Sequence, residues 1–124
     1  MGQSWKYSNR FSPSAPVVAV QLAGLTLDCV LDTGFSGGVM IPFPIFGSLG
    51  LLSRLVPDEY MAVMPDSRRV PIYTARDEVT VGSSRISALI HASPRLERRL
   101  AGRAFLERFV ATLDGPGRVL SLSD

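Results

Sequence analysis

The chain has 124 residues, of which 46% are hydrophobic and 19% charged, and its net charge is +2. This composition is typical of one folded domain and excludes a disordered chain. A net charge this small gives no indication of a nucleic-acid partner. No apolar stretch approaches the roughly twenty residues of a membrane-spanning helix, and the N-terminus lacks an apolar signal core. We therefore expect a cytoplasmic protein that binds neither nucleic acid nor a membrane.

Cysteine and histidine each occur once, as Cys29 and His91. A single cysteine excludes an internal disulfide, and a single histidine argues against a zinc site. Both residues lie in apolar, strand-like runs. We expect Cys29 to be a buried free thiol and His91 to have a structural role.

The first half of the chain indicates an arm followed by short strands. Residues 1–16 are polar and rich in serine and proline, and are predicted to be an extended arm, flexible or lying on a partner. Alternating apolar residues then predict a hairpin over 17–22 and 25–31, turning at Ala23-Gly24. A short strand over 39–42 follows, then a loop marked by Pro42, Pro44 and Gly47, and a short helix over 46–55.

The second half continues with hairpins. We expect strands over 60–64 and 69–75, joined by a turn that Pro65 favours, and then strands over 78–81 and 85–92. An arginine-rich segment over 95–99 leads to a short helix over 104–108 and a last hairpin over 110–122. Many short strands with one or two short helices predict an all-β, closed, barrel-like domain over residues 17–124.

The segment with a chemical signature is Asp32-Thr33-Gly34, which ends the second predicted strand. An apolar run carries the carboxyl group to its end, and Gly34 lets the main chain approach closely, because it has no Cβ. Read alone, the tripeptide also fits a strand that ends in an ordinary turn. Its flanking residues decide between the two interpretations.

The order of these elements resembles the retroviral-type (retropepsin-like) aspartic peptidases, and in particular their single-domain bacterial and archaeal members. The family shows an opening hairpin, an Asp-Thr-Gly loop, a flap hairpin and an apolar-apolar-Gly-Arg segment before a short helix. Here the second signature is Leu100-Ala101-Gly102-Arg103. In the family, its apolar residues pack beneath the active-site loop. The two signatures stand in the family's order and separation.

The resemblance implies a homodimer with the acid-protease fold, because one chain supplies only one Asp-Thr-Gly. Asp32 of each subunit would meet on the twofold axis and share a proton, and the pair would activate a water that hydrolyses a peptide bond. Thr33, Gly34 and Ser36 would support the loop. The flap candidate, which would cover a peptide or protein substrate, is Met64, Pro65, Asp66, Ser67 and Arg68. The family's mechanism needs no metal and no cofactor.

Three positions depart from the family. Phe35 replaces the usual small residue, and it removes a hydroxyl donor that would stabilise an ionised Asp32, so we expect cleavage at weakly acid to neutral pH. The acid that often pairs with the family's arginine is replaced by Ser36, which leaves the role of Arg103 open. The flap candidate has no glycine.

Two other functions fit the same residues. One is a dimeric binding or assembly module that keeps the fold without cleaving, since a fold does not fix a function. The other is a serine hydrolase, because residues 34–38 satisfy the Gly-x-Ser-x-Gly pattern with Ser36 as the nucleophile. That pattern must lead directly into a helix, and the prolines over 39–44 argue against one there.

Overall fold

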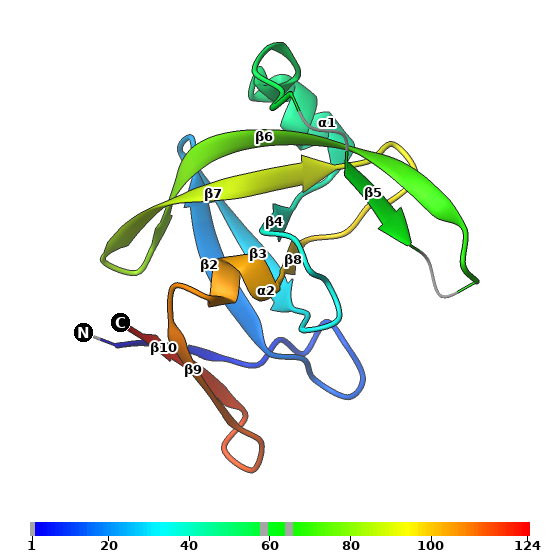
Figure 1. The fold of residues 1–124 in the computed structure, drawn as a ribbon. Helices are drawn as coiled ribbons and strands as arrows, with labels where there is room; N and C mark the ends of the chain where they lie inside the picture. The colour runs from blue at the N-terminus through cyan, green and yellow to red at the C-terminus, as the bar shows by residue number, and fades with distance from the viewer. Residues whose placement is uncertain (1, 58–59, 64–65) are drawn as a thin grey trace.

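The computed structural model describes residues 2–57, 60–63 and 66–124. Strands dominate the described residues, and the helices are short (Figure 1). The strands are β1 (Gln3–Lys6), β2 (Val17–Leu22), β3 (Leu25–Leu31), β4 (Val39–Met40), β5 (Tyr60–Val63), β6 (Arg69–Val81), β7 (Ser84–Ala92), β8 (Leu100–Ala101), β9 (Val110–Asp114) and β10 (Val119–Ser123). The helices are α1 (Phe43–Ser48), a 3-10 turn η1 (Leu51–Ser53) and α2 (Arg103–Leu106).

Six strands close into a barrel, as the sequence predicted. They are hydrogen-bonded in the order β2-β3-β8-β4-β7-β6, and Gln21 of β2 pairs with Thr80 of β6 to complete the ring. β5 lies outside this ring, on the edge of β6. The buried interior is apolar and contains Val18, Val20, Phe46, Phe105 and Leu120, all at most 1% exposed.

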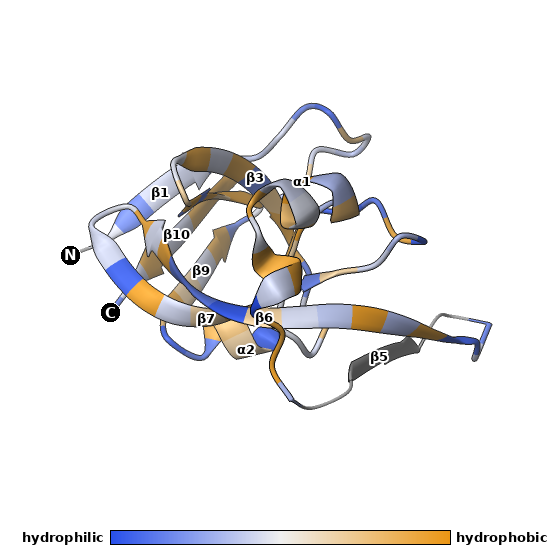
Figure 2. Cartoon of the chain, turned by 90° about the horizontal axis from the view of Figure 1, so that it is seen from above, coloured by the Kyte–Doolittle hydropathy of each residue, from blue (hydrophilic) through white to orange (hydrophobic). Residues whose placement is uncertain are grey.

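Turn chemistry and alternation explain the predicted hairpins. Ala23 and Gly24 both have positive φ, 49° and 84°, which is the backbone that suits a tight two-residue hairpin turn between β2 and β3. Figure 2 shows hydrophobic and hydrophilic stretches along β6, and exposed residues alternate with more buried ones along most of β6 and β7. β6 is one continuous strand, whereas we expected separate strands over 69–75 and 78–81. β7 pairs with it without interruption from Tyr73–Ala92 to Val81–Ser84, which keeps residues 76 and 77 extended.

The helix after β4 begins earlier than expected. We predicted a loop around Pro42, Pro44 and Gly47 and a helix over 46–55, and both boundaries were wrong. α1 begins at Phe43, directly after Pro42, and Pro44 lies in its first turn. Proline is tolerated there because the amide it lacks would have no partner within the helix. Gly50, with φ of 73°, follows α1 and caps the start of η1.

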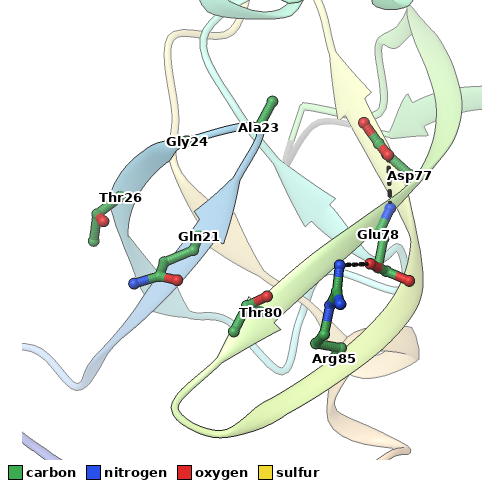
Figure 3. A pocket seen from close by; sticks show the side chains of 8 residues that line it. All are labelled: Gln21, Ala23, Gly24, Thr26, Asp77, Glu78, Thr80 and Arg85. Atoms are coloured by element: carbon green, nitrogen blue, oxygen red, sulfur yellow. Dashed lines mark hydrogen bonds and ion pairs between the residues drawn. The ribbon is translucent and has the colours of Figure 1, made fainter.

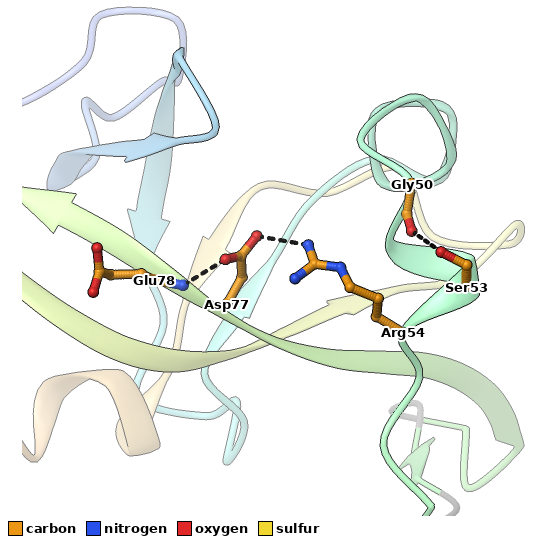
Figure 4. Close-up of polar contacts among 5 residues, drawn as sticks. All are labelled: Gly50, Ser53, Arg54, Asp77 and Glu78. Carbon is orange, nitrogen blue, oxygen red and sulfur yellow. Dashed lines mark hydrogen bonds and ion pairs between the residues drawn. The ribbon is translucent and has the colours of Figure 1, made fainter.

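An ion pair attaches the α1–η1 segment to the barrel. The guanidinium of Arg54 lies 3.0 Å from a carboxylate oxygen of Asp77 on β6 (Figure 4). The other carboxylate oxygen of Asp77 accepts the Glu78 amide at 2.7 Å. The Ser53 hydroxyl donates to the Gly50 carbonyl at 2.8 Å within the same turn.

The two termini form a second, smaller sheet. β1 pairs with β10, and β10 pairs with β9, all antiparallel. The predicted arm over 1–16 therefore contains a strand paired within its own chain, and a bridge between Ser8 and Ala15 closes the loop that follows β1. Among the described residues, no helix is both long and apolar enough to cross a membrane.

Candidate active site

Asp32 is the first residue after β3, and backbone hydrogen bonds fix its position. β3 pairs in parallel with β8, with Val30 opposite Leu100 and Leu31 opposite Ala101. The Asp32 amide continues this ladder by donating to the Ala101 carbonyl at 2.9 Å. One carboxylate oxygen of Asp32 accepts the Gly34 amide at 2.9 Å. The carboxyl group is thus held at the rim of the barrel and remains partly exposed.

The second signature holds the loop over 32–38 from behind. The Gly102 amide donates to the Gly38 carbonyl at 2.8 Å, and the Arg103 amide donates to the Phe35 carbonyl at 2.8 Å. The Ala104 amide donates to the Gly37 carbonyl at 3.0 Å. The first turn of α2 therefore meets the loop that follows Asp32, although about seventy residues separate them in sequence.

This contact between two backbones requires glycine. A Cβ on Gly102 would lie 2.4 Å from the Gly37 carbonyl oxygen and 2.7 Å from that of Phe35. A Cβ on Gly38 would lie 2.3 Å from the Leu89 carbonyl oxygen. These separations are shorter than carbon–oxygen contacts allow, so Gly102 of the second signature and Gly38 of the loop are steric requirements of the site.

Arg103 has a partner that the sequence did not reveal. Its guanidinium donates to the carbonyl oxygen of Thr33 at 2.7 Å. This bond joins α2 to the outer turn of the loop, where Thr33 and Gly34 are exposed. Arg103 thus stabilises the Asp32 loop by donating to a main-chain carbonyl of the loop, and not by pairing with an acidic side chain.

A buried imidazole stands behind the loop. His91 is 1% exposed at the end of β7, and its Nε2 accepts the Gly38 amide at 3.1 Å. Its Nδ1 lies 2.8 Å from the hydroxyl of Thr74, which is 3% exposed on β6. Phe35 packs edge-on against the ring, with centroids 5.5 Å apart. Phe35 therefore fills the space behind the loop, where the family has a small residue.

Burial shifts the titration of both unique side chains. It lowers the pKa of His91 from its ordinary 6.5 to about 4, because the imidazolium loses hydration in the interior. It raises the pKa of the Cys29 thiol to about 12. His91 is thus neutral at neutral pH and Cys29 is protonated. Neither is suited to act as a general base or a nucleophile in this fold.

The hollow that contains Asp32 has a volume of about 700 Å³. Apolar side chains of Val17, Val30, Leu31, Leu100 and Phe11 line much of it. Charged residues also line it, among them Arg10, Arg98, Arg99, Asp28 and Glu97. A hollow that combines apolar side chains with a few polar groups is the arrangement expected for binding a side chain next to a reactive group.

A second hollow, of about 470 Å³, lies between the β2–β3 and β6–β7 hairpins (Figure 3). Its charged groups already have partners: Arg85 pairs with Glu78, and Asp77 pairs with Arg54. A hollow whose charges are satisfied within the chain offers little to an ionic ligand. The hollow at Asp32 is therefore the better candidate.

The described part of the flap candidate forms a turn of its own. Met64 and Pro65 fall outside the described residues. Asp66 caps the turn by accepting the Arg68 amide at 3.1 Å and pairing with its guanidinium at 2.6 Å, and Ser67 has a positive φ of 67°. No hydrogen bond or ion pair of the described residues joins Asp66, Ser67 or Arg68 to the Asp32 loop.

Ser36 is exposed on the same loop, two residues from Gly34 and Gly38. The segment after it forms β4, and a helix begins only at Phe43. Our expectation that residues 39–44 could not start a helix was wrong, but the direct strand-to-helix turn of a nucleophile elbow is nevertheless absent at this serine. Both ring nitrogens of His91 are engaged with Gly38 and Thr74. This geometry does not favour a serine hydrolase.

No family model matches the sequence, and no curated protein matches it either. Among solved structures, the chain is similar to a retropepsin-like aspartic protease from Rickettsia conorii, with a TM-score of 0.73 over 98% of each chain. The chain has the retropepsin-like fold. Sequence identity to that protein is 16%, so this similarity establishes the fold and not the chemistry.

In the retropepsin-like fold of this chain, the segments of the two signatures are bonded to each other. Asp32, Thr33, Gly34 and Ser36 lie on one loop, and Leu100, Ala101, Gly102 and Arg103 lie behind it. Neither Thr74 nor His91 was expected at this site from the sequence. The signal that could have indicated them is a lone histidine in the apolar strand that precedes the second signature, together with the Gly37-Gly38 pair.

We expect Gly102→Ala to destabilise the protein by about 1–3 kcal/mol, because its Cβ would overlap two backbone carbonyl oxygens. Gly102 has φ of −96°, which alanine adopts readily, so the effect is steric. Urea unfolding measures it. The matched control is Gly115→Ala, where no heavy atom lies within 4 Å of the new Cβ, and there we expect a change below about 0.5 kcal/mol. Equal stability of both variants would contradict the close contact.

We also expect His91 to make stability depend on pH. Below about pH 6.5 the unfolded chain gains a proton at His91 that the folded chain does not take up until about pH 4. Stability should therefore fall by roughly 3 kcal/mol between these values, beyond the effect of the carboxyl groups. Urea unfolding from pH 7 to 4 measures it, with His91→Gln as a control without a titratable ring. An identical pH slope in both proteins would contradict the prediction.

Proposed function

We propose that the protein is an aspartic endopeptidase that acts as a homodimer, with Asp32 of each subunit forming the catalytic pair. The observation that carries this proposal is the arrangement of Asp32 at the end of β3 within a retropepsin-like fold: its amide is bonded to Ala101, and the loop after it is held by the Gly102–Ala104 backbone. The substrate would be a peptide or a protein, and no cofactor takes part.

A single chain presents half of such a site. Its loop offers one carboxyl group, and the outer residues Thr33 and Gly34 are exposed to the surroundings. In a twofold dimer each loop would face its copy, so that two carboxyl groups lie close together. Close carboxylates do not both ionise, and the pair holds one proton between them.

The chemistry follows from this shared proton. The ionised Asp32 takes a proton from a water molecule, and the oxygen of that water attacks the peptide carbonyl carbon. The protonated Asp32 donates a hydrogen bond to the carbonyl oxygen. The Asp32 that took the proton from water then gives it to the amide nitrogen as the carbon–nitrogen bond breaks. The apolar hollow beside Asp32 would hold a side chain next to the scissile bond.

The edge strand β9 is the surface that best fits a second copy. β9 pairs only with β10 in the described residues, and all five of its residues are exposed. Leu113 lies opposite the buried Leu120 but is itself 52% exposed, and Val110 is 60% exposed. Residues 110–113 carry no charge that would discourage edge pairing. α2 and the short segment after it join this strand to the Asp32 loop, so a dimer formed here would be continuous with the site.

We expect Asp32→Asn to lower kcat/KM by about 10²–10⁴-fold while leaving the fold and the dimer intact, because the amide cannot act as the base. Cleavage of a diverse peptide library, followed by mass spectrometry from acid to neutral pH, measures it. Asp77→Asn, which makes the same change on β6 outside the lining of the Asp32 hollow, is the matched control and should keep its activity. Equal cleavage by wild type and Asp32→Asn would refute the catalytic role, and a wild type that binds peptides without cleaving them would indicate a binding module.

We expect Leu113→Lys to weaken the dimer at least tenfold in Kd, because an apolar contact is lost and a charge is placed on the strand edge. Sedimentation equilibrium measures the dimer, and specific activity against protein concentration should fall in parallel. Leu25→Lys, which changes a leucine 40% exposed on β3, is the control. An unchanged Kd for Leu113→Lys would place the interface elsewhere.

A further inference from the structure

His91 connects the loop that carries Asp32 to the strand that carries the flap hairpin. Its ring lies between Gly38, the last residue of the loop, and Thr74 of β6. Thr74 marks the point where β6 leaves the barrel: residues 73–81 pair with β7, and residues 69–72 pair with β5. Figure 1 shows β5 and the adjoining end of β6 projecting from the barrel, and Figure 2 shows the same end of β6.

We propose that His91 is a positioning residue of the aspartic peptidase site, and that its imidazole sets the place of the Asp32 loop relative to β6 through Gly38 and Thr74. This inference rests on the proposed function for its catalytic consequence. The hydrogen bonds that carry it do not depend on that function.

The two bonds determine where the ring proton lies. An amide can only donate, so Nε2 must accept the Gly38 N–H through its lone pair. In a neutral ring the single proton is then on Nδ1, which donates to the Thr74 hydroxyl oxygen. A protonated ring would place an N–H against the Gly38 N–H and would break this connection.

The ring has little room to change its position. Phe35 packs edge-on against it, and a Cβ on Gly37 would lie 2.7 Å from Nε2 and 2.5 Å from Phe35 Cζ. Gly38 is also held at its other end, because its carbonyl accepts the Gly102 amide. A displacement of the imidazole would therefore be transmitted to the loop and to the contact with α2.

Burial lowers the pKa of the ring and so keeps it neutral. The elements packed around it are the Asp32 loop, β4 and β6. β4 carries no titratable residue. The titratable residues on the other two are Asp32, Arg69, Tyr73, Arg76, Asp77 and Glu78, and His91 shares its own strand β7 with Arg85.

The consequence for catalysis is geometric. The Asp32 loop is held by backbone bonds from the start of α2 and by the hydrogen bond from Gly38 to His91. Loss of the His91 contact would let Gly38 and the residues before it shift, and small displacements of a catalytic group reduce the rate more than they reduce substrate binding.

The test compares Thr74→Val with Thr74→Ser. Valine keeps the shape of threonine and removes the acceptor of the Nδ1 proton, whereas serine retains that acceptor. We expect Thr74→Val to lower kcat by about fivefold to tenfold, the range for one buried hydrogen bond, with KM within about twofold of the wild type. Thr74→Ser should retain kcat within about twofold, provided that both variants unfold cooperatively in urea.

A spectroscopic measurement tests the geometry without any substrate. The ¹⁵N chemical shifts of His91 should show a protonated Nδ1 and an unprotonated Nε2 in the wild type and in Thr74→Ser, and a changed Nδ1 signal in Thr74→Val. A protonated Nε2 in the wild type, or equal kcat and equal His91 signals in both variants, would overturn the proposal. A wild type with the expected signals but no cleavage of any peptide would instead overturn the proposed peptidase function.

Discussion

The backbone contact between the Asp32 loop and the start of α2 is the constraint on which the site depends. Main-chain bonds from Gly102, Arg103 and Ala104 reach three carbonyls of the loop, and the Asp32 amide bonds back to Ala101. Backbone groups are rigid and always present, so they place a carboxyl group more reproducibly than long side chains do. The barrel serves this contact by bringing β3 and β8 together in parallel.

Close approach of two backbones leaves a space behind them that side chains must fill. Phe35 and His91 occupy it here, and both pack where a Cβ on Gly37 would lie. A small residue at position 35 would leave a cavity beside the imidazole, which costs stability in a well-packed interior. Phe35 and His91 are therefore best understood as a pair that fills this space together.

The sequence alone predicted the elements whose signals are local. Alternation over 17–31 and the Ala23-Gly24 turn specified the first hairpin, and the paired signatures placed Asp32 beside Gly102. The predictions from the sequence were wrong where the position of a residue within an element, or its contacts with distant elements, decides the outcome. Pro44 was interpreted as a helix breaker, yet it lies in the first turn of α1, where its missing amide has no consequence. The strand break near residue 76 is absent because β7 pairs along the whole of this segment. The bond between Arg103 and Thr33 ends on a carbonyl, which every residue has, so no pattern of residue types could indicate it.

The proposed catalytic pair and the buried imidazole need opposite proton states. Two neighbouring carboxyl groups work only while they hold one proton, which is lost as the pH rises. His91 supports the loop only while its Nε2 is free of a proton, a state that is lost as the pH falls toward the pKa of about 4. The enzyme would thus be limited on the acid side by its scaffold and on the alkaline side by its catalytic pair. Strong acid would protonate His91 and so disturb the position of the loop that carries Asp32. An aspartic peptidase supported in this way therefore suits weakly acid to neutral conditions.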